Sequence, residues 1–367
     1  MSTPRRPITR SLMAIMRLCR DARASRLIVR THACDLQPGW YWFDNRLARR
    51  IGSPLPQHLE ATKTRRSARR SEPTQRRIVF LMRRALTAVP RRVSKRIGDP
   101  LGAVAALHSW EGSTLLIAPE AGWVRRVASE PRFDVEYREL RERFADCVPI
   151  PPCSVKVGGH VIVEEFVHGA PFQFQSHADQ RAAVCGLLER LASLVERHST
   201  GSARAHYAEQ LDRIKEHEIP RAMRRYLNHT VIDSLLLPGP LVPSHGDLKK
   251  KNVIVIDGHL IVIDLGDSLA WRGFWVDALK LVWHCSPQDF LDGCFDDHLR
   301  DLWSAAGFHE VDIASNRASL VAAHVLFELP ALRWTQPPVR WENASTSAVL
   351  EKLWSGRVPD REARWYE

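Results

Sequence analysis

The chain has 367 residues, 44% of them hydrophobic, which is enough to bury the core of one large domain or two ordinary ones. Its net charge of +11 is uneven, because residues 1–100 hold 22 Arg and 2 Lys against 6 acidic residues. That basic front has a net charge of +18, so the other 267 residues carry −7. No apolar run approaches the roughly 20 residues of a transmembrane helix, which excludes an integral helical membrane protein.

Seven cysteines are scattered along the chain, and no two of them form a C-x-x-C pair. An odd and scattered set predicts neither a disulfide framework nor a zinc site. Free cysteines are typical of a reducing compartment, so we expect a cytoplasmic protein. Residues 1–20 are rich in Arg and free of acids, as in transit peptides, but they lack the continuous apolar core of a secretory signal.

The basic front is expected to be an N-terminal extension over residues 1–100. Residues 26–43 hold enough apolar and aromatic side chains to be ordered. Residues 53–75 are polar and basic and contain proline, which is typical of a linker. Because such a linker offers few core-forming residues, we expect deletion of residues 1–75 to leave a folded body.

A basic amphipathic helix is predicted over residues 76–90. Its apolar side chains recur at helical spacing as far as Pro90, and arginines crowd the other positions. Such a helix can lie on an anionic membrane surface, which would make the protein peripheral at the membrane. The alternative is that its apolar face packs on the body and its arginines face solvent. Nucleic acid is not an expected partner, because no zinc-finger or helix-turn-helix pattern accompanies the charge.

Residues 101–169 predict a small lobe with an antiparallel sheet and one helix. Three strands are predicted, at residues 103–107, 114–118 and 123–128. The turn between the first two contains a single glycine, Gly112. The run at residues 133–144 predicts the helix, and residues 159–167 predict a further hairpin.

Residues 170–367 predict a mostly helical large lobe. Its strongest helix is expected over residues 178–198, where apolar side chains form one stripe at helical spacing. The stripe consists of Val184, Leu187, Leu188, Leu191, Leu194 and Val195. A more polar helix is expected over residues 203–228, and helical patterns alternate with polar turns beyond residue 287. The two lobes together predict an α+β chain.

The most informative stretch, residues 244–268, has the sequence SHGDLKKKNVIVIDGHLIVIDLGDS. Two β-branched runs joined by Asp-Gly predict a hairpin. That hairpin would bring Asn252, before its first strand, close to Asp264, after its second, with Asp247 in the loop ahead of them. Oxygen-bearing side chains that meet at one end of a sheet suit Mg²⁺, which takes few protein ligands and completes its shell with phosphate and water.

The string H-G-D, an Asn five residues after the Asp, and a hairpin ending in I-D-L-G resemble the catalytic loop and metal motif of the protein-kinase-like superfamily. The closest resemblance is to its aminoglycoside phosphotransferase and choline kinase branch. The resemblance implies a two-lobe protein-kinase-like fold, small lobe over large lobe, with ATP and Mg²⁺ as cofactors. It implies that Asp247 orients or deprotonates an acceptor hydroxyl, with Lys249 near the transferred phosphate. Asn252 and Asp264 would hold Mg²⁺ on the nucleotide phosphates.

The same resemblance implies nucleotide-binding roles in the small lobe. The first hairpin turn, with Gly112 and Ser113, would cover the phosphates with backbone N–H groups. The backbone of Glu165, Phe166 and Val167 would bind the edge of the adenine ring. A plain buried strand explains the last three residues nearly as well when they are viewed alone.

The third strand should supply a cation for the α- and β-phosphates, and here it offers two arginines in place of the usual lysine. Side chains alternate across a strand, so Arg126 shares a face with the small Val124, whereas Arg125 shares a face with the bulky Trp123. Arg126 is therefore the expected phosphate ligand. Glu136, on the next helix, resembles the acid that pairs with this cation, and two further acids of that helix are rivals.

Two residues resemble those that support the catalytic loop in this family. His245 is expected to orient the loop through backbone hydrogen bonds rather than act as the base. Asp277, in WVDALKL, resembles the aspartate that braces the loop from a following helix. Only 13 positions separate Asp264 from Asp277, which is too short for a protein-kinase activation segment and argues against a protein substrate.

The predicted function is ATP·Mg-dependent phosphorylation of a hydroxyl on a small molecule, with aminoglycosides, sugars, amino-alcohols and cell-envelope glycans as candidate acceptors. The alternative is a catalytically silent relative that serves as a binding or scaffold module, which the Arg-for-Lys change and the glycine-poor turn favour. Nucleotide-dependent thermal stabilisation without turnover would indicate that alternative. A plain hairpin with acidic ends would explain residues 244–268 without any chemistry.

Overall fold

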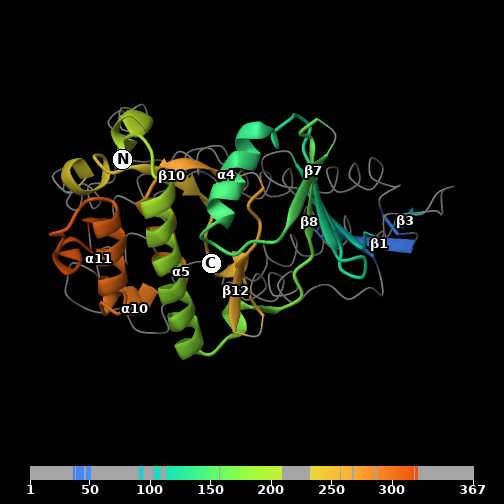
Figure 1. Ribbon diagram of the computed structural model, residues 1–367. Helices are drawn as coiled ribbons and strands as arrows, with labels where there is room; N and C mark the ends of the chain where they lie inside the picture. Colours follow the sequence, from blue (N-terminus) through green and yellow to red (C-terminus); the bar gives the residue numbers. More distant parts are fainter. Residues whose placement is uncertain are drawn as a thin grey trace, which may run out of the picture. The chain divides into compact units, whose positions relative to one another are not determined.

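The structure, a computed structural model, describes the part of the chain that contains the predicted functional stretch (Figure 1). The described residues are 36–37, 39–44, 47–50, 91–93, 103–108, 113–156, 158–208, 232–256, 258–266, 268–285, 287–317 and 319–320. The linker at residues 53–75, the helix at residues 76–90 and Gly112 lie outside them, so membrane-surface contact stays a prediction. Within the described ranges no helix is long and apolar enough to cross a bilayer.

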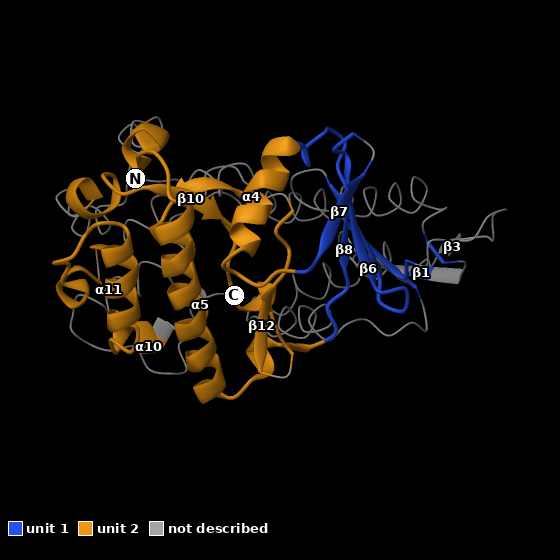
Figure 2. Cartoon of the chain, viewed as in Figure 1, with its two compact units in different colours: residues 1–134, 151–168 blue, residues 135–150, 169–367 orange. Residues whose placement is uncertain are grey.

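Two compact units divide the chain, and each is described by itself (Figure 2). Unit 1 comprises residues 1–134 and 151–168, and unit 2 comprises residues 135–150 and 169–367. An antiparallel sheet dominates unit 1, whereas the longest helices belong to unit 2. The chain is therefore α+β, as the sequence predicted.

Unit 1 holds an eight-stranded sheet in the order β3-β1-β2-β4-β5-β6-β8-β7, and every neighbouring pair is antiparallel. Its strands are β1 (Gly39–Asp44), β2 (Leu47–Arg50), β3 (Arg91–Val93), β4 (Ala105–His108), β5 (Thr114–Ala118), β6 (Trp123–Val127), β7 (Cys153–Lys156) and β8 (Val161–Glu165). The three strands predicted between residues 103 and 128 are confirmed as β4, β5 and β6. The hairpin predicted at residues 159–167 is formed by β7 and β8, so it begins earlier, at Cys153.

The sequence predicted that the small lobe begins at residue 101. Its sheet begins earlier, because the basic front supplies three of its strands, β1, β2 and β3. β2 pairs with β4, and an isolated bridge joins Leu36 to Ala103. Tyr41 of β1 is fully buried in the core, and its hydroxyl donates to the carbonyl oxygens of Gln37 at 2.8 Å and Ala103 at 3.2 Å. Burial raises the pKa of this phenol. The structure therefore contradicts the expectation that residues 1–75 can be deleted, since deletion would remove β1 and β2 and leave β4 paired with β5 alone.

Both faces of the unit 1 sheet carry apolar clusters. One cluster comprises Leu36, Tyr41, Ala103, Ala106, Leu116 and Ala118, with Trp123 and Val127 packed against it. The other comprises Ala105, Ile117 and Phe166, with Leu115 and Val124 packed against it. The alternation of β6 is thus visible in its packing, because Trp123 and Val124 contact different clusters.

Unit 2 is built mainly of helices. Those whose bounds lie within the described residues are α4 (Val135–Ala145), α5 (His177–His198), α9 (Trp275–Cys285), α10 (Pro287–Leu291) and α11 (Asp296–Ala305). The apolar stripe predicted on α5 is confirmed, since all six of its residues are buried, and α5 packs alongside α11 (Figure 1). The hydroxyl of Ser176 caps α5 by accepting the N–H of Asp179. Of the helix predicted at residues 203–228, residues 203–208 are helical and the rest lie outside the described ranges.

Helix α4 groups with unit 2 rather than with the small lobe in which the sequence placed it. Its inward face carries Tyr137, Leu140 and Phe144, all buried. That face packs against α5 and against β10 (Leu241–Ser244) and β13 (Ala270–Gly273), which form an antiparallel pair. The charged composition of the helix gave no signal of which neighbour its few apolar residues would meet.

A second small sheet of unit 2 carries the predicted functional stretch. Its strands, in the order β12-β11-β9, are β12 (His259–Val262), β11 (Val253–Ile256) and β9 (Ala170–Pro171). A short 3₁₀ helix, η4 (Lys250–Asn252), leads into β11. Residues 245–249 therefore form a loop between β10 and η4, anchored by a different sheet at each end.

Replacement of Tyr41 tests whether the basic front belongs to the fold. Tyr41→Ala should destabilise the protein by about 3–5 kcal/mol, because it removes a fully buried ring from the sheet core. Tyr41→Phe keeps the ring and loses only the hydroxyl bonds, so it should cost about 1 kcal/mol. Chemical denaturation of the full chain measures both. Equal, near-zero effects would show that β1 contributes nothing to the core.

Candidate active site

The predicted hairpin is confirmed as β11 and β12, and its open end carries two of the predicted site residues. Val253 pairs with Val262, so Asn252 and Ile263 come next to each other beyond the paired strands. The N–H of Ile263 donates to the carbonyl oxygen of Asn252 at 2.9 Å. Asp264 follows Ile263 directly, so the hairpin holds its backbone close to that of Asn252.

Asp264 has a φ of 68°, and it alone among the described non-glycine residues lies in the left-handed region. That conformation costs about 1–2 kcal/mol for a residue with a side chain. It persists only where the surroundings enforce it, and it is enriched at functional sites. Here the preceding residue, Ile263, is fixed on both sides, because its N–H bonds to Asn252 and its carbonyl oxygen accepts from His245.

His245 orients the loop, as predicted, and is not a candidate base. Its Nδ1 lies 3.2 Å from the backbone N–H of Asp247 and must accept that proton. The ring proton therefore sits on Nε2, which donates to the carbonyl oxygen of Ile263 at 2.9 Å. Both ring nitrogens are thus used to tie the loop to the hairpin.

The carboxylate of Asp277, in the first turn of α9, braces the loop from the other side, as the sequence predicted. One oxygen accepts the N–H of His245 at 2.6 Å, and the other accepts the N–H of Gly246 at 2.9 Å. Asp277 is 3% exposed, so both bonds are charge-assisted and shielded from water. The loop backbone is therefore fixed directly before Asp247.

Gly246 is required by this geometry for two reasons. Its φ of +71° lies in the left-handed region. A Cβ at this position would also lie 2.7 Å from Nε of Arg272 and 2.8 Å from the carbonyl oxygen of Ser268. The glycine of the H-G-D string therefore lets β13 and the segment before it pass close to the loop.

Asp247 is surrounded by hydrogen-bond donors. The amide nitrogen of Asn252 lies 2.9 Å from its carbonyl oxygen and 3.3 Å from its Oδ2. The ammonium group of Lys249 lies 2.5 Å from its Oδ1. Burial by itself would raise the pKa of Asp247, but the ammonium groups of Lys249 and Lys280 hold it at about 2. The side chain is therefore an anion at any physiological pH.

Lys280, which the sequence reasoning missed, is part of this site. Its Nζ donates to the carbonyl oxygen of Gly246 at 2.8 Å and lies 3.3 Å from Oδ1 of Asp247. The signal for it was present, because residues three apart on a helix share a face and Lys280 is three residues after Asp277. It was overlooked because no recognised motif includes it.

The residues at the hairpin end suit a hard cation. The amide nitrogen of Asn252 faces two oxygen acceptors of Asp247, which fixes the amide orientation and assigns the other atom, Oδ1, as its acceptor. Asp264 adds a half-buried carboxylate one residue beyond Ile263. An amide oxygen and a carboxylate are the ligand types that Mg²⁺ takes from proteins when phosphate and water supply the rest.

In unit 1, Arg126 is 4% exposed and lies opposite Leu115 on β5 and Ile162 on β8. Leu115 packs with the cluster that contains Phe166, and directly opposite residues point to the same face. Arg126 and Val124 therefore share a face, as the sequence predicted, and that face also carries Phe166. Ser113, at the entry to β5, is 1% exposed.

The segment from Glu165 to Val167 has part of its backbone already bonded within unit 1. The N–H of Glu165 donates to Pro152 at 3.0 Å, and the N–H of Phe166 donates to Gly122 at 2.9 Å. Proline has no N–H, so Pro152 cannot return a bond to the carbonyl oxygen of Glu165. A polar ligand that approached the backbone of Glu165 would therefore meet its carbonyl oxygen, which accepts, rather than its N–H group, which is already bonded.

Glu136 is exposed in the first turn of α4, which belongs to unit 2. Its rivals Glu139 and Glu142 are exposed as well, so burial does not distinguish among the three. Arg126 belongs to unit 1. The pairing of Glu136 with Arg126 stays a prediction.

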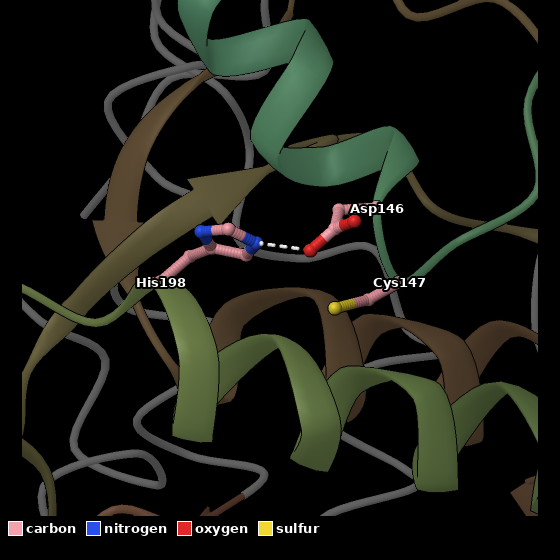
Figure 3. A group of neighbouring side chains, drawn as sticks. All are labelled: Asp146, Cys147 and His198. Atoms are coloured by element: carbon pink, nitrogen blue, oxygen red, sulfur yellow. Dashed lines mark hydrogen bonds and ion pairs between the residues drawn. The ribbon is translucent and has the colours of Figure 1, made fainter.

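Another group of ligand-type side chains lies where the segment after α4 meets the end of α5 (Figure 3). Ligand atoms of Asp146, Cys147 and His198 lie within 4.8 Å of one another. Nε2 of His198 is 2.9 Å from an Asp146 oxygen, and Arg197 is 3.8 Å from the same oxygen. Burial raises the pKa of Cys147, which disfavours the thiolate. These contacts account for Asp146 and His198 as a hydrogen-bonded pair that joins the two helix ends, with Arg197 beside it.

Comparison with known proteins gives only distant similarities. No family model and no curated protein matches the chain. Solved structures that resemble it include macrolide 2'-phosphotransferase MphH from Brachybacterium faecium, with 18% identity over 68% of this chain and 91% of that one and a TM-score of 0.42. A choline/ethanolamine kinase family protein from Mesorhizobium loti has 16% identity over 66% and 84%, with a TM-score of 0.42. An aminoglycoside phosphotransferase from Streptomyces rimosus has 18% identity over 60% and 92%, with a TM-score of 0.37.

Removal of the Asp277 carboxylate should lower the free energy of unfolding. Asp277→Ala leaves two buried N–H groups without an acceptor, so it should cost about 3 kcal/mol. The matched control is Asp297→Ala on α11, whose 84% exposed side chain pairs with Arg300 at the surface and should contribute less than about 1 kcal/mol. Chemical denaturation compares the two variants, and equal midpoints would contradict the bracing role.

Proposed function

We propose that the protein is an ATP·Mg-dependent phosphotransferase that phosphorylates a hydroxyl group of a small molecule. The observation that carries the proposal is the fixed loop: Asp247 follows a backbone bonded to Asp277 and lies within hydrogen-bond distance of Asn252. A loop braced in this way can orient a reacting hydroxyl, because its polar groups are already in place and need not rearrange during the reaction. The resemblance of residues 244–268 to the kinase-like catalytic loop supports the same reading.

Asp247 acts mainly by position. Its pKa of about 2 makes it a weak base but a permanent hydrogen-bond acceptor. Oδ1 faces two ammonium groups, whereas Oδ2 faces the amide nitrogen of Asn252 at 3.3 Å. Oδ2 is therefore the oxygen that would receive the acceptor hydroxyl and align it with the phosphoryl group.

Asn252 and Asp264 would hold Mg²⁺ through Oδ1 of the amide and the carboxylate. Bound ATP would supply the phosphoryl group, and Mg²⁺ held there would neutralise the charge that develops on it. The protein contributes the spacing, because the bond between Asn252 and Ile263 and the left-handed φ of Asp264 keep the two side chains on one hairpin end.

The nucleotide would be bound by residues of unit 1. Arg126, on the face of Val124 and Phe166, would pair with the α- and β-phosphates, and the apolar cluster of that face would cover the adenine ring. The carbonyl oxygen of Glu165 would accept from the adenine amino group. A guanidinium in place of lysine can grip phosphate through two N–H groups.

Charge removal at the catalytic loop tests the proposed reaction. Asp247→Asn and Asp264→Asn should each lower Mg²⁺-dependent ADP formation by about 10²-fold or more, because each loses a positioning or metal-binding charge while keeping its shape. Asp297→Asn is the matched control, since that side chain is 84% exposed. The assay uses full-length protein with a panel of aminoglycosides, sugars and amino-alcohols. Turnover within a few-fold of wild type in either loop variant would refute the assignment.

Arg126 and Arg125 provide a test with an internal control, because they are neighbours on opposite faces of β6. Arg126→Ala should raise the KM for ATP severely, whereas Arg125→Ala should leave it near normal. Arg126→Lys restores a charge with a different shape and should be intermediate. Equal effects at both positions would mean that the strand face is wrongly assigned, and no effect at either would favour a catalytically silent binding protein.

A further inference from the structure

Two lysines approach the same oxygen of Asp247, but they are held differently. Lys249 Nζ lies 2.5 Å from Oδ1, and Lys280 Nζ lies 3.3 Å from it. One carboxylate needs one counter-ion for charge neutrality, so a pair of ammonium groups on one oxygen is more than neutralisation requires. The repulsion between two like charges also has to be offset by other contacts.

Lys280 has such contacts and a rigid support. It is 5% exposed, it projects from α9 one turn after Asp277, and it donates to the carbonyl oxygen of Gly246 at 2.8 Å. A buried ammonium group is costly unless it is paired and hydrogen-bonded, so its place beside the loop is specific. Helix α9 therefore holds the loop at two points. The carboxylate of Asp277 accepts two backbone N–H groups of the loop, and the ammonium group of Lys280 donates to a backbone carbonyl oxygen.

Lys249 is less confined. Its side chain is 26% exposed, and it belongs to the loop itself rather than to a helix. Its ammonium group faces Oδ1 of Asp247, so a phosphate oxygen that reached this end of the loop would compete with Asp247 for it.

The resemblance already implies that Lys249 lies near the transferred phosphate. We propose that Lys280 is the fixed positioning residue of the catalytic loop, which holds Asp247 in place when Lys249 turns from Asp247 to the γ-phosphate. This inference rests on the proposed function. With Lys249 on the phosphate, Lys280 alone keeps Oδ1 of Asp247 occupied, so that Oδ2 stays turned toward the acceptor. Loss of Lys280 then damages turnover, whereas loss of Lys249 damages recognition of the γ-phosphate.

The experiment uses full-length protein, Mg²⁺-dependent ATP hydrolysis with water as the acceptor, and calorimetric binding of ADP and of the non-hydrolysable analogue AMP-PNP. Lys280→Met should lower kcat about 10²-fold while both affinities stay within about threefold of wild type. Lys249→Met should abolish any preference for AMP-PNP over ADP, because only the former carries a γ-phosphate group. Lys156→Met, at an exposed position of β7, is the matched control and should match wild type in all three measurements.

Two further variants separate positioning from a merely structural role. Lys280→Arg keeps the charge and should recover at least about tenfold of the lost turnover, and it replaces Lys280→Met if that variant does not fold. In an Asp247→Asn background, Lys280→Met should change turnover by less than about threefold, because Lys280 acts through Asp247. Additive losses in that background, or no recovery in Lys280→Arg, would overturn the inference.

The wild type decides which hypothesis a negative result contradicts. If wild-type protein hydrolyses Mg·ATP and Lys280→Met is as active, the positioning role of Lys280 is wrong and the proposed function stands. If wild-type protein neither binds nor hydrolyses Mg·ATP, the proposed function is wrong and the role of Lys280 falls with it.

Discussion

The carboxylate of Asp277 is the interaction on which the rest of the site depends. It accepts two consecutive backbone N–H groups, those of His245 and Gly246, and thereby fixes the loop that carries Asp247. His245 transmits the same constraint to the hairpin through the carbonyl oxygen of Ile263. One buried acid thus sets the backbone positions of a loop and a hairpin that are joined to different sheets.

The fixed backbone of the loop also determines the charges that surround Asp247. A half-buried carboxylate would normally become a weaker acid, yet the pKa of Asp247 is held at about 2 by ammonium groups that approach a single oxygen. An anion so strongly stabilised is better suited to orienting a hydroxyl than to removing its proton. Positioning and charge placement are also what phosphoryl transfer demands of a protein, since its transition state needs little covalent help.

The sequence was most informative where local chemistry decides the structure. The Asp-Gly turn and two β-branched runs predicted the hairpin, whereas the contact of Asp277 with the loop was predicted by the resemblance of WVDALKL to the family's bracing helix. The sequence was least informative where distant segments meet. Strands β1 and β2 were hidden in an arginine-rich front whose charge suggested an extension, and Lys280 was hidden because its partner lies 33 residues earlier in the chain, at Asp247. Such pairings depend on packing that no local pattern encodes.

The most direct test of the account is the binding of a divalent ion at the hairpin end. Mn²⁺ can replace Mg²⁺ at oxygen ligands and reports its surroundings by electron paramagnetic resonance. We expect full-length protein with AMP-PNP to bind Mn²⁺ in a protein-nucleotide environment, and Asn252→Ala to lose that signal while free Mn²⁺·AMP-PNP remains. An identical spectrum with and without protein, at concentrations where the nucleotide is bound, would contradict the claim that Asn252 and Asp264 form the metal site of a phosphotransferase.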